Sequence, residues 1–199
     1  MPCGAATIDA MLGPVVNVAL RAGMLVLLGR VLRASPDDHR FVGKGIGVRF
    51  TAVALPATML VPAVWWRHRH EVPYPASVDA LYVSLFALDL AGNVFDWYDS
   101  YMHFDLIPHA HGGGAITVLF AWLFRMPVSH AVAWSIAGHA LLEAQEYASD
   151  KAFGLRNVRG WWDVVGDLSA GVVGAVAYAI AYDRLVRGAG REPASPLGR

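Results

Sequence analysis

The chain has 199 residues, of which 56% are hydrophobic and 16% charged, whereas a typical soluble domain is about 45 to 50% apolar and about 25% charged. The excess of apolar residues predicts contact with lipid rather than with water. The 16 basic and 16 acidic residues give no net charge, so nucleic acid is excluded as a partner on electrostatic grounds.

Six segments are long and apolar enough to be candidate membrane spans, because a helix needs about 20 residues, or about 17 at the short end, to cross the hydrocarbon core. In chain order they are residues 11–32, 46–66, 77–97, 109–124, 128–148 and 163–186. They predict an all-α fold, a polytopic membrane helix bundle. The fourth segment is the shortest, and its histidine- and glycine-rich start is expected to lie in a cavity instead of in lipid.

The rest of the chain predicts one transmembrane domain over residues 1–187 and a disordered tail over residues 188–199, which is rich in Gly, Pro and Arg. The first basic residue, Arg21, already lies inside the first apolar run, so this run is predicted to be retained and not cleaved as a signal peptide. Lysine and arginine divide almost evenly between the two sets of loops, so they leave the orientation in the membrane open.

Ionisable residues in the predicted spans follow helical spacing. Such residues are costly in a bilayer, and those present usually face the interior of a bundle and have a function. Three helices carry stripes on one face, formed by Asp89, Asn93 and Asp96 in the third, His139, Glu143 and Glu146 in the fifth, and Asp163 and Asp167 in the sixth. The spacing i, i+4, i+7 of the first two sets places each of them on a single face.

In an antiparallel bundle, the ends of the third and fifth helices lie at the same membrane face as the starts of the fourth and sixth. The polar groups of all four helices are therefore predicted to meet. Crowded carboxylates repel one another and take up protons, unless a bound cation stabilises their ionised form. Mixed histidine and carboxylate ligands suit zinc, iron or manganese. The predicted ligands of a divalent metal ion are His103, His109, His111, Glu143, Glu146, Asp163 and Asp167.

The catalytic candidates are Asp99, His103 and Glu143, with Asp99 as a residue that orients a ligand or as a general base. Each part of this cluster also has a simpler explanation. The histidines are ordinary at a headgroup boundary, Glu143 and Glu146 could form a solvated last helical turn, and Asp163 could cap a helix start. Arg49, near the start of the second helix, could snorkel or supply a cation to an anionic head group.

The second half of the chain resembles the YjdF-type family of small bacterial inner-membrane proteins, which has no established activity. The resemblance covers residues 93–174 and rests on Tyr98-Asp99, His103-Phe104, the pair Glu143 and Glu146, and the pair Asp163 and Asp167. The run from His109 to Gly112 is richer in histidine than the family pattern. The resemblance implies a multi-pass protein of the bacterial cytoplasmic (inner) membrane.

Three functions are compatible with this pattern. The leading hypothesis is a metal-dependent hydrolase or lipid-modifying enzyme whose partners are membrane lipids. The second is a small cation- or proton-coupled transporter, in which Asp89, Asn93, His139 and Glu143 extend the cluster into the bilayer as a pathway. The third is a structural membrane protein without catalysis. A homo-oligomer is an open alternative for any of the three.

Overall fold

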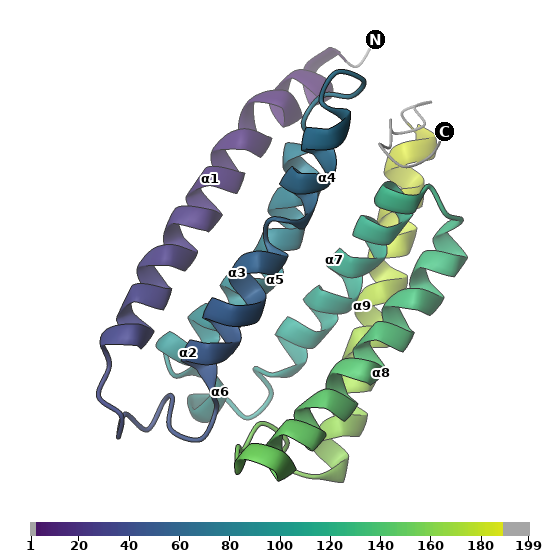
Figure 1. Cartoon of the computed structure of the whole chain (residues 1–199). Helices are drawn as coiled ribbons and strands as arrows, with labels where there is room; N and C mark the ends of the chain where they lie inside the picture. Colours follow the sequence, from purple (N-terminus) through teal and green to yellow (C-terminus); the bar gives the residue numbers. More distant parts are fainter. Residues whose placement is uncertain (1–2, 189–199) are drawn as a thin grey trace.

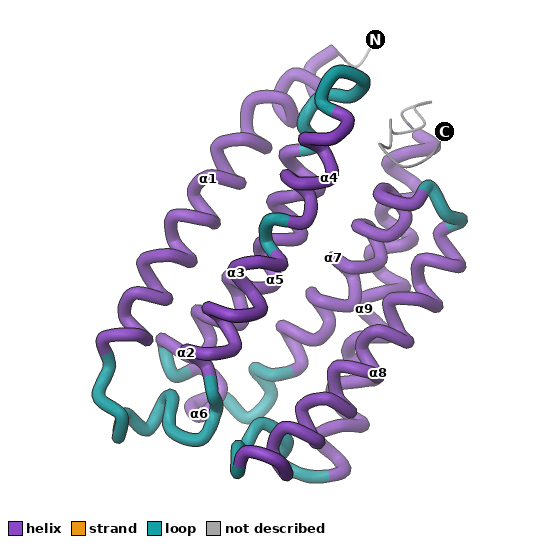
Figure 2. Tube along the Cα trace, viewed as in Figure 1, coloured by secondary structure: helices purple, strands orange, loops and turns teal. Residues whose placement is uncertain are grey.

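The computed structural model describes the backbone of residues 3–188 and the side chains of residues 13–185. The described residues form helices and no strands, which confirms the predicted all-α class (Figures 1 and 2). The longer helices are α1 (Cys3–Arg33), α5 (Ala76–Val94), α7 (Leu106–Phe124), α8 (Val128–Phe153) and α9 (Trp161–Gly188). The predicted single domain stays a prediction, and residues 189–199 of the predicted tail lie outside the described residues.

The second predicted span is a chain of short helical pieces. They are α2 (Ile46–Arg49), the π-helical turn η1 (Phe50–Ala54), α3 (Leu55–Ala57) and α4 (Leu60–His68). Proline causes such interruptions because it has no N–H for the helical hydrogen bond. Pro62 cannot donate to the carbonyl of Thr58, and the guanidinium of Arg21 donates to this oxygen instead, at 2.9 Å. The interruption therefore ties the second span to α1.

Five helical segments are long and apolar enough to cross a membrane, and they indicate a membrane protein. They are Gly13–Arg33, Ile46–His68, Ala76–Val94, Leu106–Phe124 and Trp161–Leu185. The predicted segment 128–148 forms α8, which is 26 residues long but is not among the five. It carries ionisable residues that reduce its hydropathy, and it packs against α7 and α9.

The helices form two groups (Figure 1). In one group, α1 and α5 pack together with the broken helix, which is our name for α2, η1, α3 and α4 taken together. In the other group, α7 packs tightly against α8 and α9. The two groups meet where α5 contacts α7. A buried apolar cluster that includes Val61, Tyr82, Leu119 and Trp122 fills this junction.

Glycines allow α7 and α9 to approach closely. A Cβ atom at Gly113 would overlap the carbonyl of Gly171, and a Cβ atom at Gly174 would overlap that of Ala110. Small residues permit such close packing of helices in membranes. Gly113 and Gly114 of the glycine run therefore serve helix packing, since a Cβ atom at Gly114 would overlap the ring of Tyr178 on α9.

A buried polar cluster lies between α1 and α5. Asp79, which is fully buried, accepts hydrogen bonds on its Oδ2 atom from Asn17 and Arg21, both at 2.7 Å. The hydroxyl of Tyr74 donates to the same oxygen. We call Asn17, Arg21, Tyr74 and Asp79 the Arg21 cluster. Its single carboxylate is matched by a single guanidinium.

Candidate metal centre

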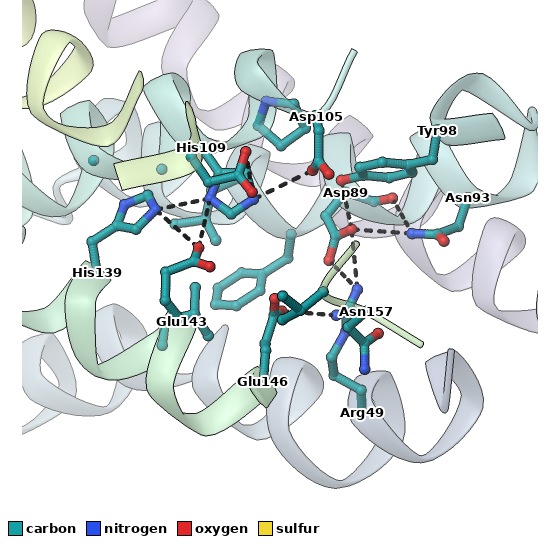
Figure 3. Close-up of a pocket in the computed structure, with 18 of the residues that line it drawn as sticks. Arg49, Asp89, Asn93, Tyr98, Asp105, His109, His139, Glu143, Glu146 and Asn157 are labelled. Atoms are coloured by element: carbon teal, nitrogen blue, oxygen red, sulfur yellow. Dashed lines mark hydrogen bonds and ion pairs between the residues drawn. The ribbon is translucent and has the colours of Figure 1, made fainter. Parts of the chain in front are cut away.

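A cavity of about 440 Å³ opens at the end of the bundle where α5 and α8 end and α7 and α9 begin. Side chains from all four helices line it, as the helix order predicts (Figure 3). A histidine and carboxylate cluster lies in its wall. The predicted convergence of polar residues at one end of the bundle is therefore confirmed.

Three side chains of this cluster point toward one another in Figure 3. The Nδ1 atom of His109 lies 2.8 Å from the Nε2 atom of His139 and 3.4 Å from the Oε1 atom of Glu143. The remaining edge, between His139 Nε2 and Glu143 Oε1, measures 3.6 Å. We call these residues the His/Glu triad.

The triad has the size and chemistry of a metal site. Ligands placed about 2.1 Å from a zinc ion at tetrahedral angles lie about 3.4 Å apart, close to the two edges that Glu143 makes with the histidines. The edge between the two histidines, at 2.8 Å, is shorter and has the length of a hydrogen bond. The Oε1 atom of Glu143 is buried and has no hydrogen-bond partner. Since a buried carboxylate oxygen is costly unless it is paired, a cation between the three atoms would satisfy it.

The second ring nitrogen of His109 faces two further carboxylates. Its Nε2 atom lies 3.3 Å from Asp105 Oδ1 and 3.9 Å from Asp167 Oδ1. A carboxylate at one ring nitrogen keeps the proton there and leaves the other nitrogen free to bind a metal. Asp105 is thus placed to orient His109 toward the triad.

Local helix geometry explains how the triad assembles. His139 and Glu143 are four residues apart on α8 and share one face. Asp105 and His109 have the same spacing at the start of α7. A Cβ atom at Gly171 of α9 would overlap the ring of His139, so this glycine makes room for the imidazole.

A second charged network lies across the cavity from the triad (Figure 3). Arg49 binds Asp89 at 2.8 Å and Glu146 at 3.3 Å, and so joins the broken helix to α5 and α8. Asp89 also accepts hydrogen bonds from Asn93 and Tyr98. Burial, together with the charge of Asp89, raises the pKa of Tyr98 well above its usual range, so the phenol remains a donor.

Three of the seven predicted metal ligands, namely His109, Glu143 and Asp167, fall in two ligand groups that share His109, with Glu143 at its Nδ1 atom and Asp167 at its Nε2 atom. Glu146 and Asp163 line the same cavity but have other partners. Glu146 pairs with Arg49, and Asp163 accepts a hydrogen bond from the backbone N–H of Arg159 at 2.8 Å. The latter contact holds the start of α9, as expected for an acid in the first turn.

The remaining candidates lie apart from the triad. His111 uses both ring nitrogens, each at 2.8 Å, to contact Ser84 and Tyr178. His103 is exposed and does not belong to the cavity wall. Asp99 lines the cavity and forms an ion pair with Lys44 at 2.7 Å.

Two members of the cluster were not predicted as ligands or catalytic groups from the sequence. Asp105 ends the acidic and aromatic segment after the third span, and His139 was assigned to a transport pathway alone. Both residues could have been found from the spacing i, i+4 between a histidine and a carboxylate. Asp105 has this spacing to His109, and His139 has it to Glu143. This spacing places the two groups on one helical face.

Comparison with family models, curated proteins and solved structures gave no match to this chain. The class of protein therefore rests on the fold and the site: a helical membrane protein with a histidine and carboxylate cluster in a cavity at one end.

Proposed function

We propose that this protein is a metal-dependent hydrolase or lipid-modifying enzyme that acts at a membrane surface. The observation that carries the proposal is the His/Glu triad, whose three ligand atoms lie 2.8 to 3.6 Å apart in the wall of a cavity. Two histidines and one glutamate form a ligand set that suits catalytic zinc, with a fourth position left for water or substrate.

A divalent ion in the triad would polarise an ester oxygen and lower the pKa of a water molecule toward neutrality. The chain's own groups then have separate tasks. Asp105 orients His109, and Asp167, 3.9 Å from the Nε2 atom of the same ring, adds a second carboxylate at the nitrogen that does not face the triad. Asp99 as general base stays a prediction, and its ion pair with Lys44 argues against this role.

Lipids are the substrates that fit this location, because a head group reaches the end of the bundle by lateral diffusion. The placement in the bacterial cytoplasmic membrane and the relation to the YjdF-type family belong to this proposal. Both rest on the sequence pattern at residues 93–174.

The test is hydrolysis of lipid esters by the purified protein in liposomes, after chelation and after metal is added back. We expect cleavage of a phosphate or carboxylic ester to stop on chelation and to return with zinc, iron or manganese. Glu143→Gln should remove the activity, while His103→Ala, at an exposed histidine, should keep it. A metal-loaded protein that cleaves neither ester class contradicts the proposal.

A cation- or proton-coupled transporter is the second candidate. The observation in its favour is the row of polar residues Ser135, His139, Glu143 and Glu146, which line the cavity along α8. Chains of acids and histidines inside a membrane carry protons in pumps and transporters. Reconstituted protein that passes neither protons nor metal ions across liposomes would exclude it.

A further inference from the structure

The cavity has two chemically different ends. The triad and the Arg49 network form the polar end. The other part of the wall is apolar and is formed by Tyr82, Leu85, Phe86, Ile116 and Phe120. These apolar residues come from α5 and α7, which also contribute to the polar end.

The change from polar to apolar follows the axis of α7. His109 lies near the start of this helix, and Ile116 and Phe120 line the cavity seven and eleven residues further on. At 1.5 Å per residue, Phe120 lies about 16 Å from His109 along the helix axis. This distance is about half the thickness of a hydrocarbon core of about 30 Å, so with His109 at the membrane surface the apolar end would lie near the level of the bilayer centre.

Helix α5 has the same gradient in the opposite chain direction. Asn93 and Asp89 line the polar end, and Phe86 and Tyr82 line the apolar end. Tyr82 and Phe86 are in edge-to-face contact, with ring centroids 5.3 Å apart, and belong to the packed junction of α5 and α7. The apolar wall is thus backed by the protein core.

The cavity is open where the polar end meets this wall. Gly112, which lines the cavity one helical turn before Ile116, has no atom within 4 Å of the position that a Cβ would take. The total of about 440 Å³ is within the usual range of about 300 to 1,000 Å³ for ligand pockets. An ion or a sugar phosphate would leave the apolar wall without a partner, whereas a hydrocarbon chain would cover it.

We propose that the substrate is an amphiphile, with an ester-linked head group at the His/Glu triad and a hydrocarbon chain against the apolar wall formed by α5 and α7. This inference rests on the proposed function for the role of the triad. It adds that chain length, and not the head group alone, determines binding.

The experiment compares two ligands with related phosphate head groups, lysophosphatidic acid with an 18-carbon chain and glycerol 3-phosphate. Binding to the full-length protein in nanodiscs is measured by native mass spectrometry, and bound metal is measured on the same samples. We expect the lipid to bind at least tenfold more tightly. We also expect Ile116→Trp, which fills the apolar end, to weaken lipid binding at least tenfold with the metal content unchanged.

Ile180→Trp is the matched control, because Ile180 is 48% exposed on α9 and lies outside the cavity wall. Leu85→Trp is the second cavity variant in case Ile116→Trp fails to fold, since Leu85 lines the apolar end and is only partly buried. Metal-loaded protein that binds both ligands equally, or cavity variants that bind the lipid normally, would overturn this inference alone. Lipid binding that depends on the chain in a protein without metal would support it and overturn the proposed function.

Discussion

The Arg21 cluster and the His/Glu triad are both buried polar groups within an apolar bundle, but they differ in charge balance and in access. In the Arg21 cluster, one carboxylate meets one guanidinium at 2.7 Å, and none of its four residues lines the large cavity. In the triad, Glu143 and the nearby Asp105 and Asp167 surround two histidines. Among the described residues, no lysine or arginine forms an ion pair with the triad.

The difference separates a structural cluster from a candidate site. A charge-balanced, closed cluster holds helices together, although the Oδ1 atom of Asp79 has no hydrogen-bond partner. A cluster with excess acid that faces a cavity requires protons or a cation. The following predictions test this contrast and the contacts around the two clusters, from the largest expected effect to the smallest.

The largest effect is expected from Arg21→Met. It leaves the fully buried Asp79 without its cation, so the free energy of unfolding should fall by about 3 kcal/mol. Thermal unfolding in detergent measures this change. The double variant Arg21→Met with Asp79→Leu should recover most of the loss, because it removes both charges. If the single variant unfolds at the wild-type temperature, the structural role of the Arg21 cluster is wrong.

A smaller loss is expected where the backbones of α7 and α9 touch. Gly174→Ala would push a methyl group into the carbonyl of Ala110 and should cost about 2 kcal/mol, as overpacking usually does. Gly23→Ala is the control, since a Cβ at Gly23 meets nothing within 4 Å, and alanine should stabilise α1 by up to about 1 kcal/mol. Equal unfolding temperatures for the two variants would contradict the close approach of α7 and α9.

Metal binding should weaken as the pH falls. A histidine ligand must be neutral and a carboxylate ligand ionised, so protons compete with the metal for these groups. Affinity should therefore fall by about tenfold or more between about pH 7.5 and 5.5. A titration with zinc at several pH values measures this. An affinity that does not change over this range would exclude His109 and His139 as ligands.

The smallest effect is expected from Asp99→Asn. Asp99 is 42% exposed and pairs with Lys44, and exposed ion pairs contribute at most about 1 kcal/mol. The unfolding temperature and the bound metal should both stay close to the wild-type values. A loss of hydrolysis with metal and stability intact would instead support the sequence-based prediction that Asp99 is catalytic.

Much of the fold could be predicted from the sequence, because apolar runs separated by Pro and Gly locate membrane helices directly. The predicted helix ends were within a few residues of the observed ones. The fourth predicted helix begins at Leu106 instead of His109, and the fifth ends at Phe153 instead of residue 148. The breaks in the second span could be suspected from Pro56 and Pro62. The hydrogen bond from Arg21 to Thr58 could not, because it joins residues far apart in the chain.

The location of the site was predicted correctly, but only some of the residues that form it were predicted. Antiparallel topology alone brings the four helix ends together. Which acids meet the histidines depends on side-chain partners that spacing does not reveal. Glu146 fits a ligand stripe as well as Glu143 does, but Arg49 binds it from another helix. His111 is two residues from His109 and therefore points to a different face of α7, toward Tyr178.

The most direct test of the account is the metal content of the protein, purified without chelator and measured by elemental mass spectrometry. We predict one equivalent of zinc, iron or manganese in the wild type. We also predict its loss in His139→Ala and Glu143→Gln, and its retention in His103→Ala at comparable unfolding temperatures. A folded wild type without metal, or full metal content in both triad variants, would contradict the assignment of the His/Glu triad as a metal centre.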